Sequence, residues 1–125
     1  MFDGLKSMAG LAGIMKDLPR IKARMEQVKE ELAALIVEAD TGGGAVKVVA
    51  SAQMQIVSVT IDPALLSGMI DSANPDHRAL AEDLIGGAVN AALVKAREAA
   101  QDHLAAAARE LNLPLPPGGL GGLLG

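Results

Sequence analysis

The fold of this chain is decided by residues 41–66, whose sequence is TGGGAVKVVASAQMQIVSVTIDPALL. The β-branched residues Val, Ile and Thr dominate this stretch, and they favour the extended conformation of strands. Gly42–Gly44 can adopt positive φ and predict a tight turn, and Ser51-Ala52 predicts the turn of a hairpin. Asp62-Pro63 ends the last strand, because proline has no N–H to donate.

The strands on either side of these turns form a predicted three-strand meander. Its strands are Ile36–Ala39, Ala45–Ala50 and Gln53–Ile61. Alternation places Val46 and Val48 on one face of the second strand. In the third strand it places Val57, Val59 and Ile61 on one face. A two-stranded hairpin alone is marginally stable in water, so the flanking segments, which are helical in pattern, are expected to cover its apolar face.

An apolar seam with seven-residue spacing precedes the sheet and predicts a helix that ends near Leu35. We expect Asp17 to cap this helix with Pro19 in its first turn, where the missing N–H does no harm. The residues before Asp17 then form a separate short helix or a kinked extension, and residues 1–10 are expected to be frayed. The seam consists of Leu11, Leu18, Met25 and Leu32, and of Ile14, Ile21, Val28 and Leu35.

Two further helices are predicted after the sheet. Residues 64–71 form a short one, and a long one opens at Asn74 or Pro75 and ends near Leu111-Asn112. We expect one domain over residues 1–112, followed by a flexible Pro/Gly-rich tail over residues 113–125. The apolar stripe of the long helix consists of Leu80, Leu84, Ala88, Ala91, Ala92 and Ala96.

Composition excludes several classes of function. The chain has 125 residues with no cysteine, no Trp, no Tyr and one Phe, so thiolate metal sites and base-stacking aromatic platforms are not expected. His77 and His103 are too far apart in sequence, and too few, to predict a zinc site. We expect no enzyme activity, no cofactor and no small-molecule substrate. No stretch approaches the ~20 apolar residues of a membrane span, so no membrane partner is expected.

The few bulky side chains predict a thin core, and small domains with thin cores often oligomerise. The net charge is −4, so any binding to a polyanion must come from a local basic patch. The first helix is basic in its N-terminal half and acidic in its C-terminal half. This is the reverse of what the helix dipole favours, so the arrangement does not serve helix stability. The basic residues are Lys16, Arg20, Lys22 and Arg24, and the acidic ones are Glu26, Glu30, Glu31 and Glu38.

Three motifs in this order resemble the YbaB/EbfC family of small bacterial nucleoid-associated proteins. The resemblance covers roughly residues 14–117. The motifs are Gly42-x-Gly44-x-Val46-Lys47-Val48 with Val59-x-Ile61-Asp62-Pro63-x-Leu65-Leu66, then Glu82-Asp83-Leu84-Ile85-x-x-Ala88-x-Asn90-x-Ala92, then Leu115-Pro116-Pro117-Gly118. The chain departs from the family in its Ser51-Ala52 turn, where Asn-Gly is frequent, and in Pro19 and the acidic residues of its first helix.

The resemblance implies an α+β fold of order α-β-β-β-α, with a small antiparallel sheet between long N- and C-terminal helices. It implies a tweezer-like homodimer that binds double-stranded DNA with little sequence preference in the bacterial cytoplasm and nucleoid. The predicted DNA-binding residues are Lys16, Arg20, Lys22, Arg24 and Lys29, and the predicted dimer contacts are Val46, Val48, Ile56 and Ser58. The alternative hypothesis is a dimeric scaffold protein that binds a protein partner through the first helix and does not bind DNA.

Overall fold

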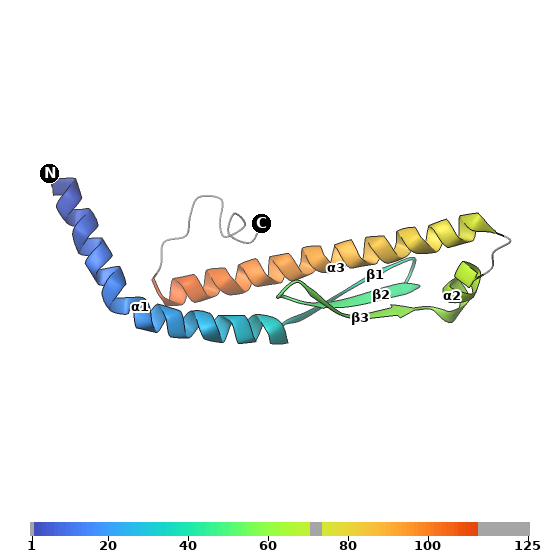
Figure 1. Ribbon diagram of the computed structural model, residues 1–125, viewed down its shortest axis with the longest axis horizontal. Coiled ribbons are helices and arrows are strands. Elements are labelled where there is room, and N and C mark those ends of the chain that lie inside the picture. The colour runs from blue at the N-terminus through green and yellow to red at the C-terminus, as the bar shows by residue number, and fades with distance from the viewer. Residues whose placement is uncertain (1, 71–73, 113–125) are drawn as a thin grey trace.

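The computed structural model describes residues 2–70 and 74–112, and within them it confirms the α+β class and the order of the elements. Figure 1 shows an elongated molecule in which one long helix runs along a small sheet and the other lies beyond the end of the sheet, beside the first helix. The predicted tail over residues 113–125 lies outside the described residues. The elements are α1 (Phe2–Ala34), β1 (Ile36–Thr41), β2 (Val46–Ser51), β3 (Gln55–Ile61), α2 (Pro63–Ile70) and α3 (Pro75–Glu110).

The three strands form one antiparallel sheet in the order β1-β2-β3, as a meander requires. Thr41 pairs with Val46 across the first turn, and Val46 pairs with Ile61 in the next strand. A register shift between Val49 and Ala50 leaves Val57 without a partner in β2, which is the pattern of a β-bulge. The bulge interrupts the strict alternation that the sequence predicted for β3.

The hairpin turn lies one residue later than predicted. β2 runs through Ser51, and the turn is formed by residues 52–54. Met54 takes the left-handed conformation with φ +64°, and its amide donates a hydrogen bond of 3.0 Å to the carbonyl of Ser51. This three-residue turn differs from the expected two-residue one because no Asn or Gly is present to adopt the paired positive φ values of the tighter turn.

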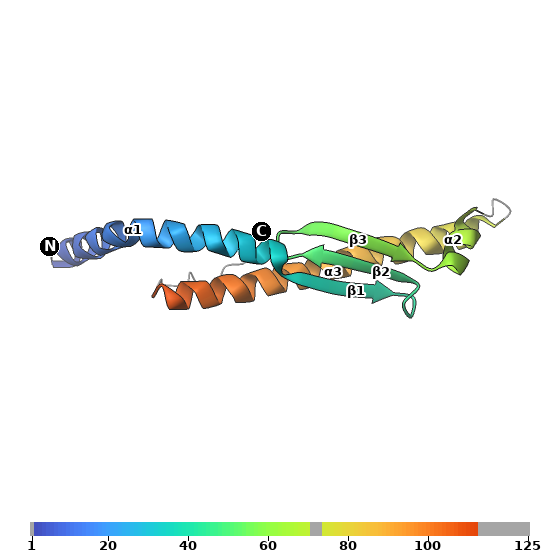
Figure 2. The ribbon, with the colours of Figure 1, turned by 90° about the horizontal axis from the view of Figure 1, so that it is seen from below.

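The core lies between α3 and the face of the sheet formed by β1 and β2. Ala88, Ala92 and Ala96 of α3 are fully buried there, and they pack against Val46 and Val48. Their small side chains let the helix approach the strands closely. Figure 2 shows the opposite face of the sheet with no element across it. The largest fully buried side chains are valines, which confirms the expected thin core.

The apolar stripe predicted for α3 is wrong at its first residue, since 56% of Leu80 is exposed. An α-helix has 3.6 residues per turn, so residues at every fourth position do not stay on one line along it. Each step of four residues rotates the side chain by about 40° around the helix axis. The row through Ala88, Ala92 and Ala96 faces the sheet, and Leu80 has therefore rotated away from it.

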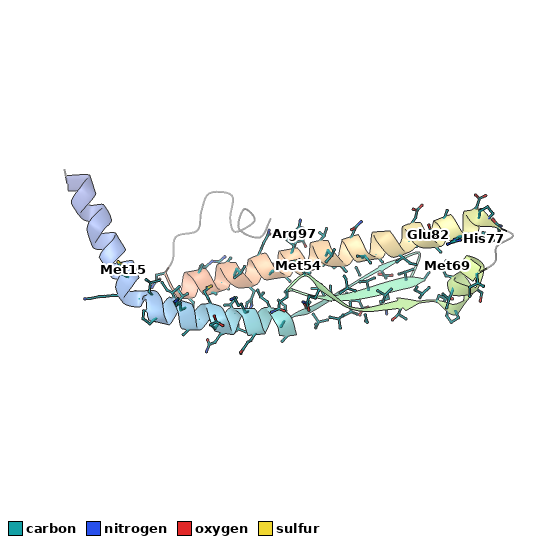
Figure 3. All side chains as sticks on the ribbon, viewed as in Figure 1. Met15, Met54, Met69, His77, Glu82 and Arg97 are labelled. Carbon is teal, nitrogen blue, oxygen red and sulfur yellow. The ribbon has the colours of Figure 1, made fainter. Side chains whose placement is uncertain are left out.

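α1 is continuous from Phe2, so the expectation of frayed first residues is wrong. Pro19 lies inside the helix rather than in its first turn. Figure 1 shows a bend in α1, and Figure 3 places Met15 at this bend. Proline at position 19 removes the hydrogen bond to the carbonyl of Met15 and crowds it, which is the usual cause of such a kink. Of the two alternatives for the residues before Asp17, the kinked extension is therefore correct.

The two halves of α1 have different surroundings. The half after the bend runs antiparallel to the C-terminal half of α3, and Val28 is buried between them with 1% of its surface exposed. The half before the bend projects away from the sheet and from α3 (Figure 1). We call the projecting part, residues 2–18, the arm.

Candidate nucleic-acid interface

Four of the five predicted DNA-binding residues are exposed on α1. Lys16, Arg20, Lys22 and Lys29 all reach solvent. Arg20 lies 3.7 Å from a carboxylate oxygen of Asp17, and Lys29 lies 4.0 Å from one of Glu26, both in exposed pairs. Exposed pairs at such distances are weak and easily exchanged, so these cations can bind another anion.

Helical spacing separates the cations of α1 into two rows. Lys16, Arg20 and Arg24 are spaced by four residues and form one row that runs from the arm toward α3. Lys22 and Lys29 are spaced by seven residues and form a second row on another side of the helix. The structure therefore does not bring all five residues to one face.

Arg24 differs from the other four because an ion-pair network holds it. Its Nε donates to Glu110 Oε2 at 2.7 Å, and its Nη1 donates to Glu31 Oε1 at 2.8 Å. Only 21% of its side chain is exposed. The second carboxylate oxygen of Glu31 lies at hydrogen-bonding distance from His103 Nε2 of α3. The network thus joins α1 to α3 on both sides of Val28.

The network also changes the acidity of its members. Hydrogen bonds from Arg24, and secondarily from His103, lower the pKa of Glu31 below its ordinary value of 4.5, although burial works in the opposite direction. Hydrogen bonds to Glu31 and Glu110 raise the already high pKa of Arg24. Both groups are therefore charged at neutral pH.

Four further cations lie on α3 and were not among the predicted DNA-binding residues, namely Arg78, Lys95, Arg97 and Arg109. Arg97 and Arg109 are both exposed, and Arg109 adjoins the residue that binds Arg24. Figure 3 shows Arg97 on the side of α3 away from the sheet. The sequence predicted the sheet and the two long helices, but not which part of α3 would pack against α1. It therefore gave no signal that Arg109 lies near the basic half of α1.

The structure separates the four predicted dimer contacts into two pairs. Val46 and Val48 are fully buried beneath α3, so they belong to the core of a single chain and present no surface to a partner. The reason is that the face shared by these valines is the one that α3 covers. Ile56 is 40% exposed and Ser58 is exposed as well, both on β3.

The two edge strands are protected to different degrees. The side chain of Lys95 from α3 donates a hydrogen bond of 2.9 Å to the carbonyl of Glu38 on β1. A lysine placed on an edge in this way blocks the addition of another strand. Across residues 2–70 and 74–112, the backbone of β3 receives no such bond from a side chain.

Large apolar side chains are exposed on β3 and on the helices next to it. Val57 is 58% exposed, Val59 43%, and Ile70 at the end of α2 76%. Leu66 of α2 and Leu80 of α3 add to this surface. We call these five residues with Ile56 the β3–α2 surface. Several large apolar side chains exposed on neighbouring elements commonly mark a site of protein association.

The sequence model of the YbaB/EbfC DNA-binding family matches residues 8–111. The chain belongs to this family. The match begins within the arm and includes the rest of α1, the whole sheet, α2 and α3. The family is a DNA-binding family rather than a family of enzymes.

Curated relatives agree with the family assignment. The chain is 37% identical over 101 residues to a nucleoid-associated protein of Anaeromyxobacter sp. strain Fw109-5, covering 81% of this chain and 91% of that protein. It is 38% identical over 104 residues to a nucleoid-associated protein of Dictyoglomus thermophilum, covering 83% and 91%. A solved structure of an uncharacterized protein from Helicobacter pylori matches with a TM-score of 0.51 and 24% identity, covering 68% of this chain and 90% of that one. This last likeness supports the fold alone.

Residues 2–70 and 74–112 contain no group of three or more His, Asp or Glu side chains that could hold a metal ion. None of the helices described is both long enough and apolar enough to cross a membrane.

Proposed function

We propose that this chain is a nucleoid-associated protein that binds double-stranded DNA as a homodimer, in the bacterial cytoplasm. Membership of a DNA-binding family over residues 8–111 is the observation that carries the proposal. The exposed cations of α1 are the groups through which the chain would bind phosphate.

Phosphate contacts explain why little sequence preference is expected. Lys16, Arg20, Lys22 and Lys29 offer charged donors on long side chains, which bind the DNA backbone and carry no information about base sequence. The net charge of −4 keeps the affinity modest, because the rest of the surface repels DNA. A homodimer doubles each row of cations and so compensates in part for this repulsion.

The homodimer would form through the β3–α2 surface. Its exposed valines and isoleucines supply apolar area that a second subunit would cover, and β3 is the less protected edge. This location also supports a tweezer-like shape. The arm and the C-terminal end of α3 lie at the other end of the molecule (Figure 1), so in the dimer they would project from its centre.

The test is a fluorescence-anisotropy titration of the protein into mixed-sequence duplex DNA at two salt concentrations. We expect saturable binding that weakens as salt rises, because each neutralised phosphate releases counterions. Arg20→Glu should weaken binding and reduce the slope of log affinity against log salt by about one. Arg78→Glu is the control, since it makes the same change of charge in the first turn of α3, where Arg78 forms an exposed ion pair with Glu82.

Two outcomes would contradict the proposal. Wild-type protein that does not bind duplex DNA even at low salt would exclude DNA as the ligand. Equal losses from Arg20→Glu and Arg78→Glu would show that net charge, and not the basic row of α1, governs binding.

The second candidate function is a scaffold that binds a protein partner through α1. The observation that favours it is the exposed apolar surface near the bend, where Met15 is 65% exposed and Leu18 42%. Residues spaced by three on a helix lie on one side and can pack against a partner helix. Leu18→Ser would then abolish partner binding, and the wild-type protein would show no binding to DNA.

A further inference from the structure

Lys16, Arg20 and Arg24 form one row of cations on α1. In this row, Arg24 is the residue whose guanidinium already donates hydrogen bonds to carboxylates of its own chain. Lys16 and Arg20 continue the same row toward the arm, and both side chains are exposed. A DNA backbone lying along this row would meet Arg24 next. There it would find the guanidinium bonded through Nε to Glu110 and through Nη1 to Glu31.

The two carboxylates occupy two of the five N–H donors of Arg24, the one on Nε and one of those on Nη1. A guanidinium binds carboxylate and phosphate oxygens with the same fork of N–H donors, so a phosphate that binds through Nε competes with Glu110. The two carboxylates also neutralise the charge of Arg24, so a phosphate binds it more strongly once a carboxylate has been displaced.

The two carboxylates are not equally easy to displace. Glu31 is held a second time by His103, and both of its oxygens have partners. Glu110 is the last residue of α3, its side chain is 60% exposed, and Arg24 is its one ion-pair partner among the described residues. Glu110 can turn into solvent without uncovering the core, and Glu31 cannot leave without breaking the contact to His103.

We propose that Glu110 is an intramolecular competitor of DNA phosphate at Arg24, so that the α1–α3 junction lowers the affinity for DNA. Displacement of Glu110 extends the phosphate-binding row by one residue, from Lys16 and Arg20 to Arg24. The proposal rests on the proposed function, and it assigns to Arg24 a role different from that of the other cations of α1.

The test compares Glu110→Gln with Asp102→Asn in the same duplex titration at several salt concentrations. Both substitutions remove one negative charge from α3, and Asp102 is exposed and has no ion-pair partner in the described part of the chain. We expect Glu110→Gln to raise the affinity about fivefold more than Asp102→Asn does, and to increase the salt slope by about one. Thermal unfolding followed by circular dichroism checks that both variants fold.

An Arg24→Gln background completes a double-mutant cycle. In that background Glu110→Gln should raise the affinity for DNA no more than Asp102→Asn does, because the guanidinium for which Glu110 and phosphate compete has been removed. Equal effects of the two charge removals in the wild-type background would overturn the proposal while leaving DNA binding intact. If neither the wild type nor Glu110→Gln binds duplex DNA, both the proposed function and the proposed competition at Arg24 fail. Binding by Glu110→Gln but not by the wild type would support the competition at Arg24 and contradict DNA binding as the function of the wild type.

Discussion

Two glycines of the turn between β1 and β2 differ in what a side chain would meet. Gly42 and Gly43 have φ of +63° and +68°, so both adopt the left-handed conformation that a side chain disfavours. A Cβ atom on Gly42 would lie 3.2 Å from the methyl carbon of Leu84 and from the Cβ of Ala45, whereas one on Gly43 would meet nothing within 4 Å. The first residue of this turn, Gly42, is therefore constrained by both its conformation and its packing. The middle residue, Gly43, is constrained by its conformation alone.

This difference predicts unequal costs of substitution by alanine. Gly43→Ala should lower the free energy of unfolding by about 1 kcal/mol, which is the cost of the left-handed conformation alone. Gly42→Ala should cost about 2 kcal/mol, because the side chains of Leu84 and Ala45 must also move aside by a small distance. Urea unfolding of both variants measures the difference. Equal losses would show that α3 does not restrict this turn.

Glu31 makes the stability of the chain depend on pH. Its pKa is lowered in the folded state, chiefly by the hydrogen bond from Arg24. The stabilisation is present above the ordinary carboxyl value of 4.5 and is lost as pH falls through the lowered value. Between these limits the unfolded chain binds more protons at this residue than the folded one.

We therefore expect urea unfolding to show a steeper loss of stability below pH 4.5 in the wild type than in Glu31→Gln. Glu30→Gln is the matched control, since it removes the neighbouring charge, which faces solvent. The same pH dependence in the wild type and in Glu31→Gln would exclude the network as its source.

At the scale of elements, α1 is one helix whose direction changes at a proline. The sequence predicted either a separate helix or a kinked extension before Asp17, and it could not decide between them. A proline is tolerated both in a first turn and, at a cost, within a helix. The residues on both sides of Pro19 favour helix strongly enough for the helix to continue through it.

Pro19→Ala should straighten α1 by restoring the hydrogen bond to Met15. The chain has no cysteine, so spin labels can be attached specifically at Gly13→Cys and Asp102→Cys. We expect the distance between the two labels to increase in Pro19→Ala, since Figure 1 shows the arm bent toward the side on which α3 lies. Labels at Ala33→Cys and Asp102→Cys should keep their distance, and an unchanged arm distance would place the cause of the bend elsewhere.

At the scale of the whole molecule, the two edges of the sheet differ, and the proposed homodimer would use one of them. β1 is blocked by Lys95, and β3 exposes Val57 and Val59 beside α2. The sequence showed that the single chain had little core, but it selected Val46 and Val48 as contacts. α3 covers one face of the strand, and packing between distant segments determines which face that is. The covered face in turn determines which valines remain exposed for a partner.

Val57→Arg should convert the homodimer to a monomer, because the new charge would be buried without a partner in the interface. Ile36→Arg is the matched control, since Ile36 is an apolar residue of the other edge strand and is 50% exposed. Light scattering coupled to size-exclusion chromatography measures the mass. A monomeric wild type would contradict the homodimer, and a monomer from Ile36→Arg alone would place the interface on β1.

The sequence by itself determined the strands, the glycine turn, the long helices and the family. These follow from propensities and motifs that act within a few residues. The tertiary structure decided which members of a chemically similar set have which role. It buried Val46 and exposed Val57, and it left Arg20 exposed while binding Arg24 to Glu110, 86 residues away. Burial and ion pairing depend on partners brought together by packing, and no local pattern in α1 contained Glu110.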